Sequence, residues 1–443
     1  MFILGLAARH CLDVPQVGVN GFREAFPIPL AEVCMPLFRR VAVVLWAVAA
    51  TLTITGFSGC NSETTTSAGP KVIKIVSSLP RTGSAKAQTD TIVNGIKLAF
   101  DEASDKAGEF TIEYSDLDDA TAAAGQWTAE AETANAQRAV KDPDVMIYIG
   151  TYNSGAAKIS MPILNQAGLM MLSPANTWPG LTKPGKGDPG EPEIYRPTGK
   201  VTYLRVVPAD DLQGPLGAKW AQEMGVKKVF ILDDNEVYGR GIAQLFEEAC
   251  EDLKVEVLGH ESIDAKAQEF KSLMTRIKGL KPDMIYFGGT TQSKGGQVAK
   301  DMVSAGLDCK LMVPDGCRED AFIQSAGAEN LNDRCFVTFG GLPPDELTGS
   351  GKEFVERYTK KYGGQPEAYA IYGYECAKVA LAAIEKAGKK DRAAILEAAI
   401  SMKDFKGALG AWTFDANGDS TLTTLSGSVV KDGKFEFVKV LGE

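Results

Sequence analysis

Residues 145–173 read VMIYIGTYNSGAAKISMPILNQAGLMMLS, and this stretch decides the fold class. It opens with an apolar run, Val145–Gly150, of the length expected for a buried strand. Ala156–Gln166 follows with apolar residues at helical spacing, and Leu169–Ser173 is a second short apolar run. A strand, a helix and a second strand in this order predict one unit of a parallel sheet that carries helices on its faces.

Similar units are predicted on both sides of this stretch. Before it, the pattern indicates strands at 71–79 and 110–115 and helices at 88–104 and 120–142. After it, a Pro- and Gly-rich segment, Asn176–Lys200, predicts a long exposed loop. The alternation then resumes, with predicted strands at 228–233, 254–258, 284–288, 310–314 and 335–339, helices at 238–253, 267–278, 295–305, 352–362, 368–387 and 392–402, and hairpin strands over 412–440. Two such sets predict an α/β protein with two doubly wound parallel-sheet lobes.

Composition excludes several classes of function. The 443 residues suffice for two to four domains, and the net charge of −10 argues against a nucleic-acid partner. The two histidines, His10 and His260, are too few for a histidine-based metal site or a Ser-His-Asp triad. The sequence holds no Walker A, Cys-x-x-Cys or Gly-x-Ser-x-Gly motif. We therefore expect no enzyme activity, no metal and no cofactor.

The N-terminal region resembles an export signal. Val41–Ser62 is uncharged, follows Arg39 and Arg40, and contains Phe57-Ser58-Gly59-Cys60, which is similar to the lipobox of bacterial lipoproteins. This likeness implies removal of residues 1–59, a lipid on Cys60 and a tether over 60–70, whereas an uncleaved membrane anchor is the alternative. Residues 1–34 fit no signal, so we expect translation to begin at Met35. Under both interpretations the body lies on the extracytoplasmic face of the membrane.

Five cysteines remain once Cys60 is set aside for lipid. Cys309 and Cys335 stand at the starts of two predicted strands that we expect to be neighbours, and exported proteins can keep disulfides, so we predict that this pair is bonded. Cys250 and Cys376 lie on predicted helices of different lobes, where a bond would lock the lobes together.

Small polar residues follow the predicted strands, where ligands bind in open α/β sheets. Ser154 opens a helix after the strand 145–150, which makes it a seat for a carboxylate or simply a helix cap. Asp315 follows the strand 310–314, as an acidic ligand-binding group or a turn residue. An anion seat and an acid on different lobes are what a zwitterionic amino acid requires.

The chain from Lys71 to its C-terminus resembles the leucine/isoleucine/valine-binding proteins, the type I periplasmic binding proteins that serve ABC importers of branched-chain amino acids. The likeness rests on Gly150–Pro174, on Gln213-Gly214-Pro215, which it implies to be a turn beside the hinge, and on Tyr238-Gly239-x-Gly241, Gly288-Gly289 and Gly306-Leu307. It implies a monomeric solute-binding lipoprotein with permease subunits as partners. Its two lobes would be joined by a three-stranded hinge. The first would comprise residues 71–208 plus 341–428, and the second 209–340 plus 429–443.

The resemblance also implies roles for single residues. Ser154 would bind the α-carboxylate, Ala175 and Thr177 both the carboxylate and the ammonium, and Asp315 the ammonium. Tyr238 would close over the ligand from the second lobe, and Tyr372 lies near an aromatic wall position.

Two departures from the family pattern concern the ligand side chain. Gln88 stands where branched-chain binders have an aromatic lid residue, and Thr290 stands near a tyrosine of their pocket. Both make the pocket less apolar, so we expect a polar or amide-bearing amino acid to compete with leucine or to bind better. The alternative function is a ligand-sensing receptor module of the same fold for amides, urea or other small polar solutes.

Overall fold

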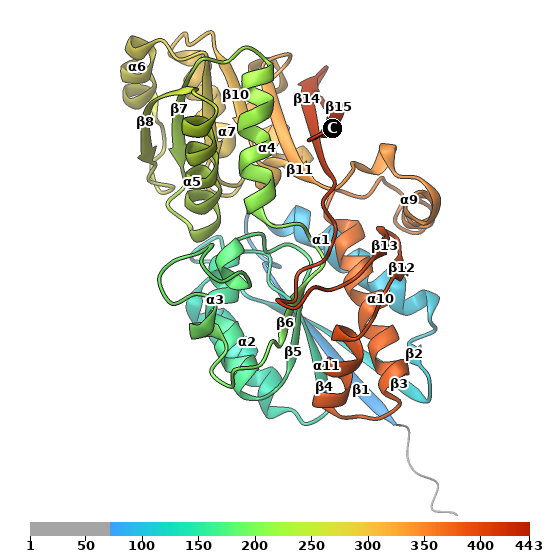
Figure 1. Cartoon of the computed structure of the whole chain (residues 1–443). Coiled ribbons are helices and arrows are strands. Elements are labelled where there is room, and N and C mark those ends of the chain that lie inside the picture. Colours follow the sequence, from blue (N-terminus) through green and yellow to red (C-terminus); the bar gives the residue numbers. More distant parts are fainter. Residues whose placement is uncertain (1–70) are drawn as a thin grey trace, which may run out of the picture. The chain divides into compact units, whose positions relative to one another are not determined.

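The structure, a computed structural model, describes residues 71–443 and contains two large β-sheets (Figure 1). The predicted signal region, the start at Met35, the lipid on Cys60 and the tether over 60–70 lie outside the described residues. Within residues 71–443, no helix combines the length and the apolar character needed to cross a membrane.

The first sheet is parallel except at one edge. Its strands lie in the order β2 (Lys106–Ala107), β3 (Phe110–Asp118), β1 (Val72–Leu79), β4 (Val145–Gly150), β5 (Met170–Ser173) and β6 (Tyr203–Arg205), with β2 antiparallel to β3. The chain moves outward from β1 in both directions, and β1 pairs with both β3 and β4. The predicted strand–helix–strand unit is therefore β4, α3 (Ser154–Gln166) and β5.

The second sheet combines five parallel strands with a C-terminal hairpin. The order is β15 (Lys434–Leu441), β14 (Leu425–Lys431), β11 (Cys335–Gly340), β10 (Lys310–Val313), β9 (Met284–Gly288), β7 (Lys228–Asp233) and β8 (Glu256–Ser262). β14 pairs antiparallel with β11 and with β15. Asp432 and Gly433 turn the hairpin with positive φ angles of 47° and 71°, as a tight two-residue turn requires.

Helices cover both sheets. With the first sheet pack α1 (Lys86–Glu102), α2 (Ala129–Lys141), α3, α9 (Gly349–Tyr362), α10 (Ala370–Ala387), α11 (Arg392–Ile400) and the small hairpin β12 (Phe405–Gly407) and β13 (Gly410–Trp412). With the second sheet pack α4 (Asp210–Glu223), α5 (Val237–Asp252), α6 (Lys271–Leu280), α7 (Gly295–Ser304) and α8 (Asp320–Ala326).

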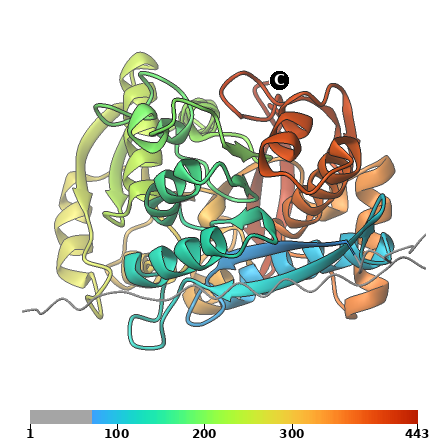
Figure 2. The ribbon, with the colours of Figure 1, turned by 90° about the horizontal axis from the view of Figure 1, so that it is seen from below.

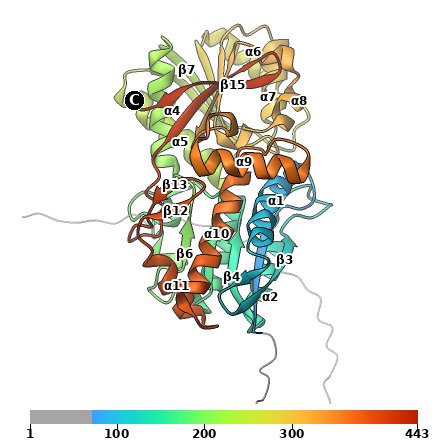
Figure 3. The ribbon, with the colours of Figure 1, turned by 90° about the vertical axis from the view of Figure 1, so that its right-hand side faces the viewer.

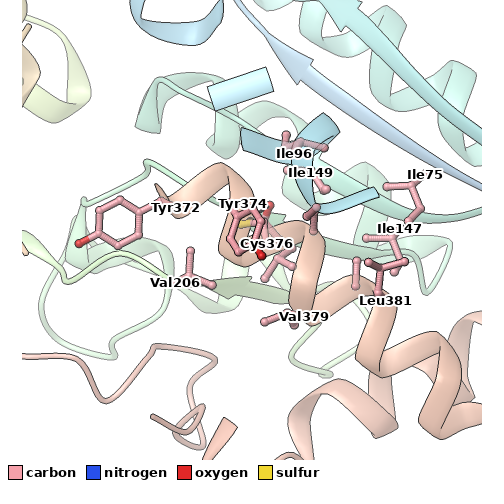
Figure 4. Packing of buried hydrophobic residues seen from close by; sticks show 14 of the residues in the cluster. Ile75, Ile96, Ile147, Ile149, Val206, Tyr372, Tyr374, Cys376, Val379 and Leu381 are labelled. Atoms are coloured by element: carbon pink, nitrogen blue, oxygen red, sulfur yellow. Dashed lines mark hydrogen bonds between the residues drawn. The ribbon is translucent and has the colours of Figure 1, made fainter. Parts of the chain in front are cut away.

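Alternate residues of the buried strands serve different faces of the first sheet. Ile147 and Ile149 pack with α1 and α10, and Figure 4 shows part of this core. Tyr148, between them, packs with α2 and α3 on the other face. Figure 2 shows the blue and teal strands of this sheet together with the teal and red helices that accompany it. Strands buried on both faces read as continuous apolar runs, which is why the sequence predicted them.

Two glycines allow α1 and α10 to run side by side (Figure 3). A Cβ at Gly95 would lie 2.1 Å from the carbonyl oxygen of Ala370, and one at Gly373 would lie 2.3 Å from that of Ile92. The two backbones therefore approach each other more closely than any other residue type permits.

Three segments of the described chain connect the two sheets. They follow β6, β11 and β13, and hydrogen bonds join them: Gly341 N donates to Thr424 O at 2.8 Å, and Arg205 N donates to Gly418 O at 3.0 Å. The predicted last boundary, after residue 428, falls inside β14, which belongs to the second sheet from Leu425 onward. That boundary was wrong because no residue pattern marks the point at which the chain passes from the first sheet to the second.

Three local predictions were also wrong. The helix predicted at 120–142 begins only at Ala129, because Gly125 turns the chain with a φ of 69° and Thr128 caps the helix by accepting from Ala131 N at 3.2 Å. The segment 176–200, predicted to be exposed, is partly buried: Trp178 and Glu191 both lie inside, and Trp178 Nε1 donates to the Glu191 carboxylate at 2.8 Å. The segment around Gln213, predicted as a turn, lies inside α4.

The predicted Cys309–Cys335 disulfide is contradicted as well, because both cysteines are free and buried. Cys335 pairs in register with Leu311, so Cys309 lies two residues away along the neighbouring strand. An offset of about 6–7 Å along the strand, added to about 4.8 Å between strands, exceeds the Cα separation that a disulfide can bridge.

Candidate functional site

The carboxyl ends of strands from both sheets surround one cavity. β4 and β5 contribute the segments that begin at Thr151 and Pro174, while β7, β9 and β10 contribute those that lead to Tyr238, Thr290 and Asp315. The lining residues are Tyr152, Asn153, Ser154, Ala175, Tyr238, Thr290, Asp315, Gly316 and Tyr369. Five of the predicted site residues are thus brought together, from different lobes: Ser154, Ala175, Tyr238, Thr290 and Asp315.

The first sheet supplies a seat for an anion. Ser154 is the first residue of α3 and is buried at the positive end of the helix dipole, where the backbone N–H groups have no partner within the helix. Its hydroxyl accepts from Trp178 N at 3.4 Å. Thr177, predicted to act with Ser154, is buried and does not line the cavity, and its carbonyl accepts from Asp210 N at 2.9 Å.

The second sheet supplies a buried acid. Asp315 accepts hydrogen bonds from Gln213 Nε2 and Tyr238 Oη, both at 2.5 Å, and from Tyr369 Oη. Burial raises the pKa of this carboxyl, and the three hydrogen bonds act in the opposite direction. Asp315 is thereby held in one orientation at the cavity wall, where a cationic group would find a carboxylate oxygen.

Tyr238 links the wall to the helix behind it. It is the second residue of α5, and its hydroxyl donates to Asp315 and accepts from Gly316 N at 3.0 Å. The predicted position of Tyr238 in the site therefore agrees with the structure, but its hydroxyl is directed at the acid.

Two tyrosines that the sequence analysis did not assign line the same cavity. Tyr152 and Tyr369 meet edge to face, with ring centroids 6.1 Å apart. The predicted Tyr372 lies one helical turn beyond Tyr369 and donates to Gly340 O, beside the crossing segments. The sequence does not separate Tyr369 from Tyr372, because residues three apart at the start of a helix lie on nearly the same face.

Gln88 and Thr290 differ in their positions. Thr290 lines the cavity and pairs its hydroxyl with Ser293 Oγ at 2.9 Å. Gln88 is buried on α1 outside that lining, and its Nε2 donates to Arg318 O at 3.4 Å. Gln88 is therefore placed between the lobes, behind the wall of the cavity.

A second cavity adjoins the first and shares four of its lining residues, Asn153, Ser154, Tyr238 and Thr290. Trp127, Asp234 and Gln292 are among the residues it adds. Asp234 accepts from Ser293 Oγ at 2.5 Å, and burial raises its pKa to about 7. Within residues 71–443, His, Cys, Asp and Glu side chains form no group of three that could hold a metal ion.

Comparisons with known proteins identify the family of the chain. The model of the family described as "Periplasmic binding protein" matches residues 72–434. A curated relative, Leu/Ile/Val-binding protein homolog 2 of Brucella abortus (strain 2308), is 28% identical over 355 residues, which cover 78% of this chain and 86% of that protein.

Two solved structures are similar over most of the chain. The leucine binding protein LivK from Thermotoga maritima has a TM-score of 0.74 and 26% identity, covering 83% of this chain and 98% of that one. LivJ from Streptococcus pneumoniae, solved in complex with isoleucine, has a TM-score of 0.72 and 25% identity, covering 83% of this chain and all of that one. The chain therefore belongs to the periplasmic binding protein family, and it is similar there to proteins named for binding leucine, isoleucine and valine.

Proposed function

We propose that the protein is an extracytoplasmic solute receptor that captures an α-amino acid between its two lobes and delivers it to an ABC importer. One observation carries the proposal: Ser154 at the N-terminus of α3 and the carboxylate of Asp315 line one cavity from different sheets. A zwitterion would place its carboxylate at the first and its ammonium at the second. Binding of amino acids is also what the names of the relatives describe.

Calorimetry on the purified protein tests this proposal with a panel of L-amino acids. We expect Asp315→Asn to weaken binding of the tightest ligand about 30-fold or more, because removing one partner of a buried charge pair costs about 2–5 kcal/mol. Asp308→Asn is the matched control, since Asp308 is fully exposed at the opposite end of β10. Equal affinity for the amino acid and for its analogue without the amino group would contradict the proposal.

Two further parts of the proposal have separate readouts. A lipid on Cys60 predicts that Cys60→Ala moves the protein from the membrane fraction to the soluble fraction. Delivery to an importer predicts that deletion of the gene abolishes uptake of the bound amino acid at low external concentration. Restoration of uptake by wild-type protein, and its failure with Asp315→Asn, would link transport to the cavity.

A further inference from the structure

A group of four polar side chains lies between the lobes beside the cavity. We call Gln88, Tyr152, Gln292 and Glu319 the polar cluster. Tyr152 lines the first cavity and Gln292 lines the second, which connects the cluster to both. Gln292 Nε2 donates to Glu319 Oε1 at 3.0 Å, and Gln88 Nε2 donates to the carbonyl of the preceding residue, Arg318, at 3.4 Å. The cluster therefore joins α1 of the first lobe to two loops of the second.

Each member of the polar cluster keeps a buried polar atom without a hydrogen-bond partner. The atoms are Gln88 Oε1, Tyr152 Oη, Gln292 Oε1 and Glu319 Oε2. A buried polar group left unpaired typically costs about 1–3 kcal/mol, so four such atoms at one place are unusual. The two amide oxygens can only accept hydrogen bonds, and so can the oxygens of an ionised Glu319. Beside the cluster Arg318 Nε is an unpaired donor, and the Tyr152 hydroxyl can also donate, but three of the cluster's four unpaired atoms are acceptors. The cluster thus favours a partner that donates.

The electrostatic surroundings favour the same kind of partner. Burial raises the pKa of Glu319 to about 7, and the negative charges of Glu367 and Asp320 act in the same direction. The pKa of Tyr152 is raised by burial first and then by the charges of Glu319 and Asp315. Arg318, the neighbouring cation, places its guanidinium over the ring of Phe435, 4.2 Å from the centroid. The potential at the cluster is therefore unfavourable for an anion.

We propose that the polar cluster is the subsite for the ligand's side chain, and that it selects amino acids whose side chain ends in a nitrogen that donates hydrogen bonds. Glu319 is the specificity-determining residue of this subsite, which rejects acidic side chains and gains little from aliphatic ones. The inference rests on the proposed function, because it assumes that Ser154 and Asp315 hold the two charged ends of an amino acid.

Three ligands of one skeleton test the inference. Leucine, asparagine and aspartate have the same branching of heavy atoms and differ only in whether the two terminal groups are methyls, an amide or a carboxylate. Calorimetry should give asparagine, or its longer homologue glutamine, at least tenfold tighter binding than leucine, and no measurable binding of aspartate. 2,4-Diaminobutyrate, with an ammonium in the same region, distinguishes a subsite for cations from one for amides, and tighter binding of either supports the inference.

Two variants connect the selectivity to the polar cluster. Glu319→Gln should improve aspartate binding at least tenfold relative to leucine, because it removes a like charge. Gln88→Leu should improve leucine binding relative to asparagine at least fivefold, and it keeps the test decisive should Glu319→Gln fold poorly. Glu375→Gln is the matched control: Glu375 is a buried glutamate with a pKa raised to about 7 that binds Trp412 in the first lobe, away from the cavity.

The outcomes separate the inference from the proposed function. Leucine binding at least as tightly as asparagine would overturn the inference and leave the proposed function standing. Unchanged ligand ratios in both variants would also overturn it. Failure of every amino acid to bind would overturn both.

Discussion

The carboxylate of Asp210 is buried at the start of α4, and neither of its oxygens has a hydrogen-bond partner. Its pKa is raised, first by burial and then by the negative charge of Asp315. An acid whose pKa is higher in the folded state favours folding at low pH, and this contribution disappears as the pH rises through the folded pKa. Asp210 therefore opposes folding increasingly above about pH 4.

Asp210→Asn should raise the free energy of unfolding of the ligand-free protein, with a gain that grows between pH 4 and pH 8. Each unit of pKa shift that the substitution removes corresponds to about 1.4 kcal/mol. Thermal unfolding at several pH values measures this, with Asp211→Asn, the more exposed neighbour in the same helix turn, as control. A gain that is equal at pH 4 and pH 8 would contradict the assignment.

At the same scale, the sequence predicted the residues whose position follows from a strand end. Ser154, Ala175 and Asp315 come shortly after strands, and carboxyl ends of parallel strands meet at one edge, whereas Tyr238 and Thr290 were proposed from the family resemblance alone. Tyr369 could not be predicted in place of Tyr372, because the choice depends on where α10 begins and how it is rotated. Gln213 was missed since Gly214-Pro215 indicates a turn, whereas packing keeps α4 helical through the proline.

At the scale of elements, the contact between α1 and α10 depends on the absence of side chains at Gly95 and Gly373. Gly373→Ala should lower the free energy of unfolding by about 1–3 kcal/mol, because the new Cβ meets backbone that cannot move aside. Chemical denaturation measures the change. Gly279→Ala in α6 is the matched control: its Cβ would meet nothing within 4 Å, and the higher helix propensity of alanine should leave stability equal or slightly increased. Similar effects of both substitutions would show that the close approach is unimportant.

Elements were predicted best where burial is complete. β4, β9 and β10 are apolar runs whose ends the sequence marks within a residue or two. The start of α2 was predicted nine residues early, because alanines in the loop after Ala120 have high helix propensity, while the turn at Gly125 sets the actual start. Helix propensity alone could not show that Trp127 lines the second cavity instead of lying in a helix.

At the scale of the molecule, Gly241 of α5 lies at a close contact between the lobes. A Cβ at this position would lie 2.4 Å from the ring of Trp178, which follows β5 of the first sheet. Gly241→Ala should therefore hinder the approach of the lobes and weaken ligand binding about tenfold, or about 1.4 kcal/mol. The melting temperature of the ligand-free protein should change less than the affinity, because the clash with Trp178 arises only where the two lobes meet. Calorimetry and thermal unfolding separate the two effects, and a fall in melting temperature with unchanged affinity would contradict this account.

The two-lobed architecture followed from the sequence, whereas the last crossing did not. The repeated strand–helix units predicted two parallel sheets, and the Pro- and Gly-rich segment separated the two sets of units. Residues after Trp412 read only as hairpin strands, and the same pattern suits either sheet. Pairing of β14 with β11 is a contact between segments about 90 residues apart, which no local pattern encodes.

The five free cysteines of the described chain are all buried, and they lie in both lobes. Burial raises the pKa of Cys250 to about 12 and that of Cys309 to about 11, so almost no reactive thiolate exists at neutral pH in the folded protein. A buried thiol can be alkylated only when the lobe that contains it unfolds, so the alkylation rate measures the unfolding of that lobe. The alkylation rate of Cys376 reports unfolding of the first lobe, and that of Cys335 reports unfolding of the second. One mass-spectrometric experiment on the wild-type chain measures both rates. A difference between the two rates would reveal which lobe unfolds first. A ligand that contacts both lobes should lower both alkylation rates together.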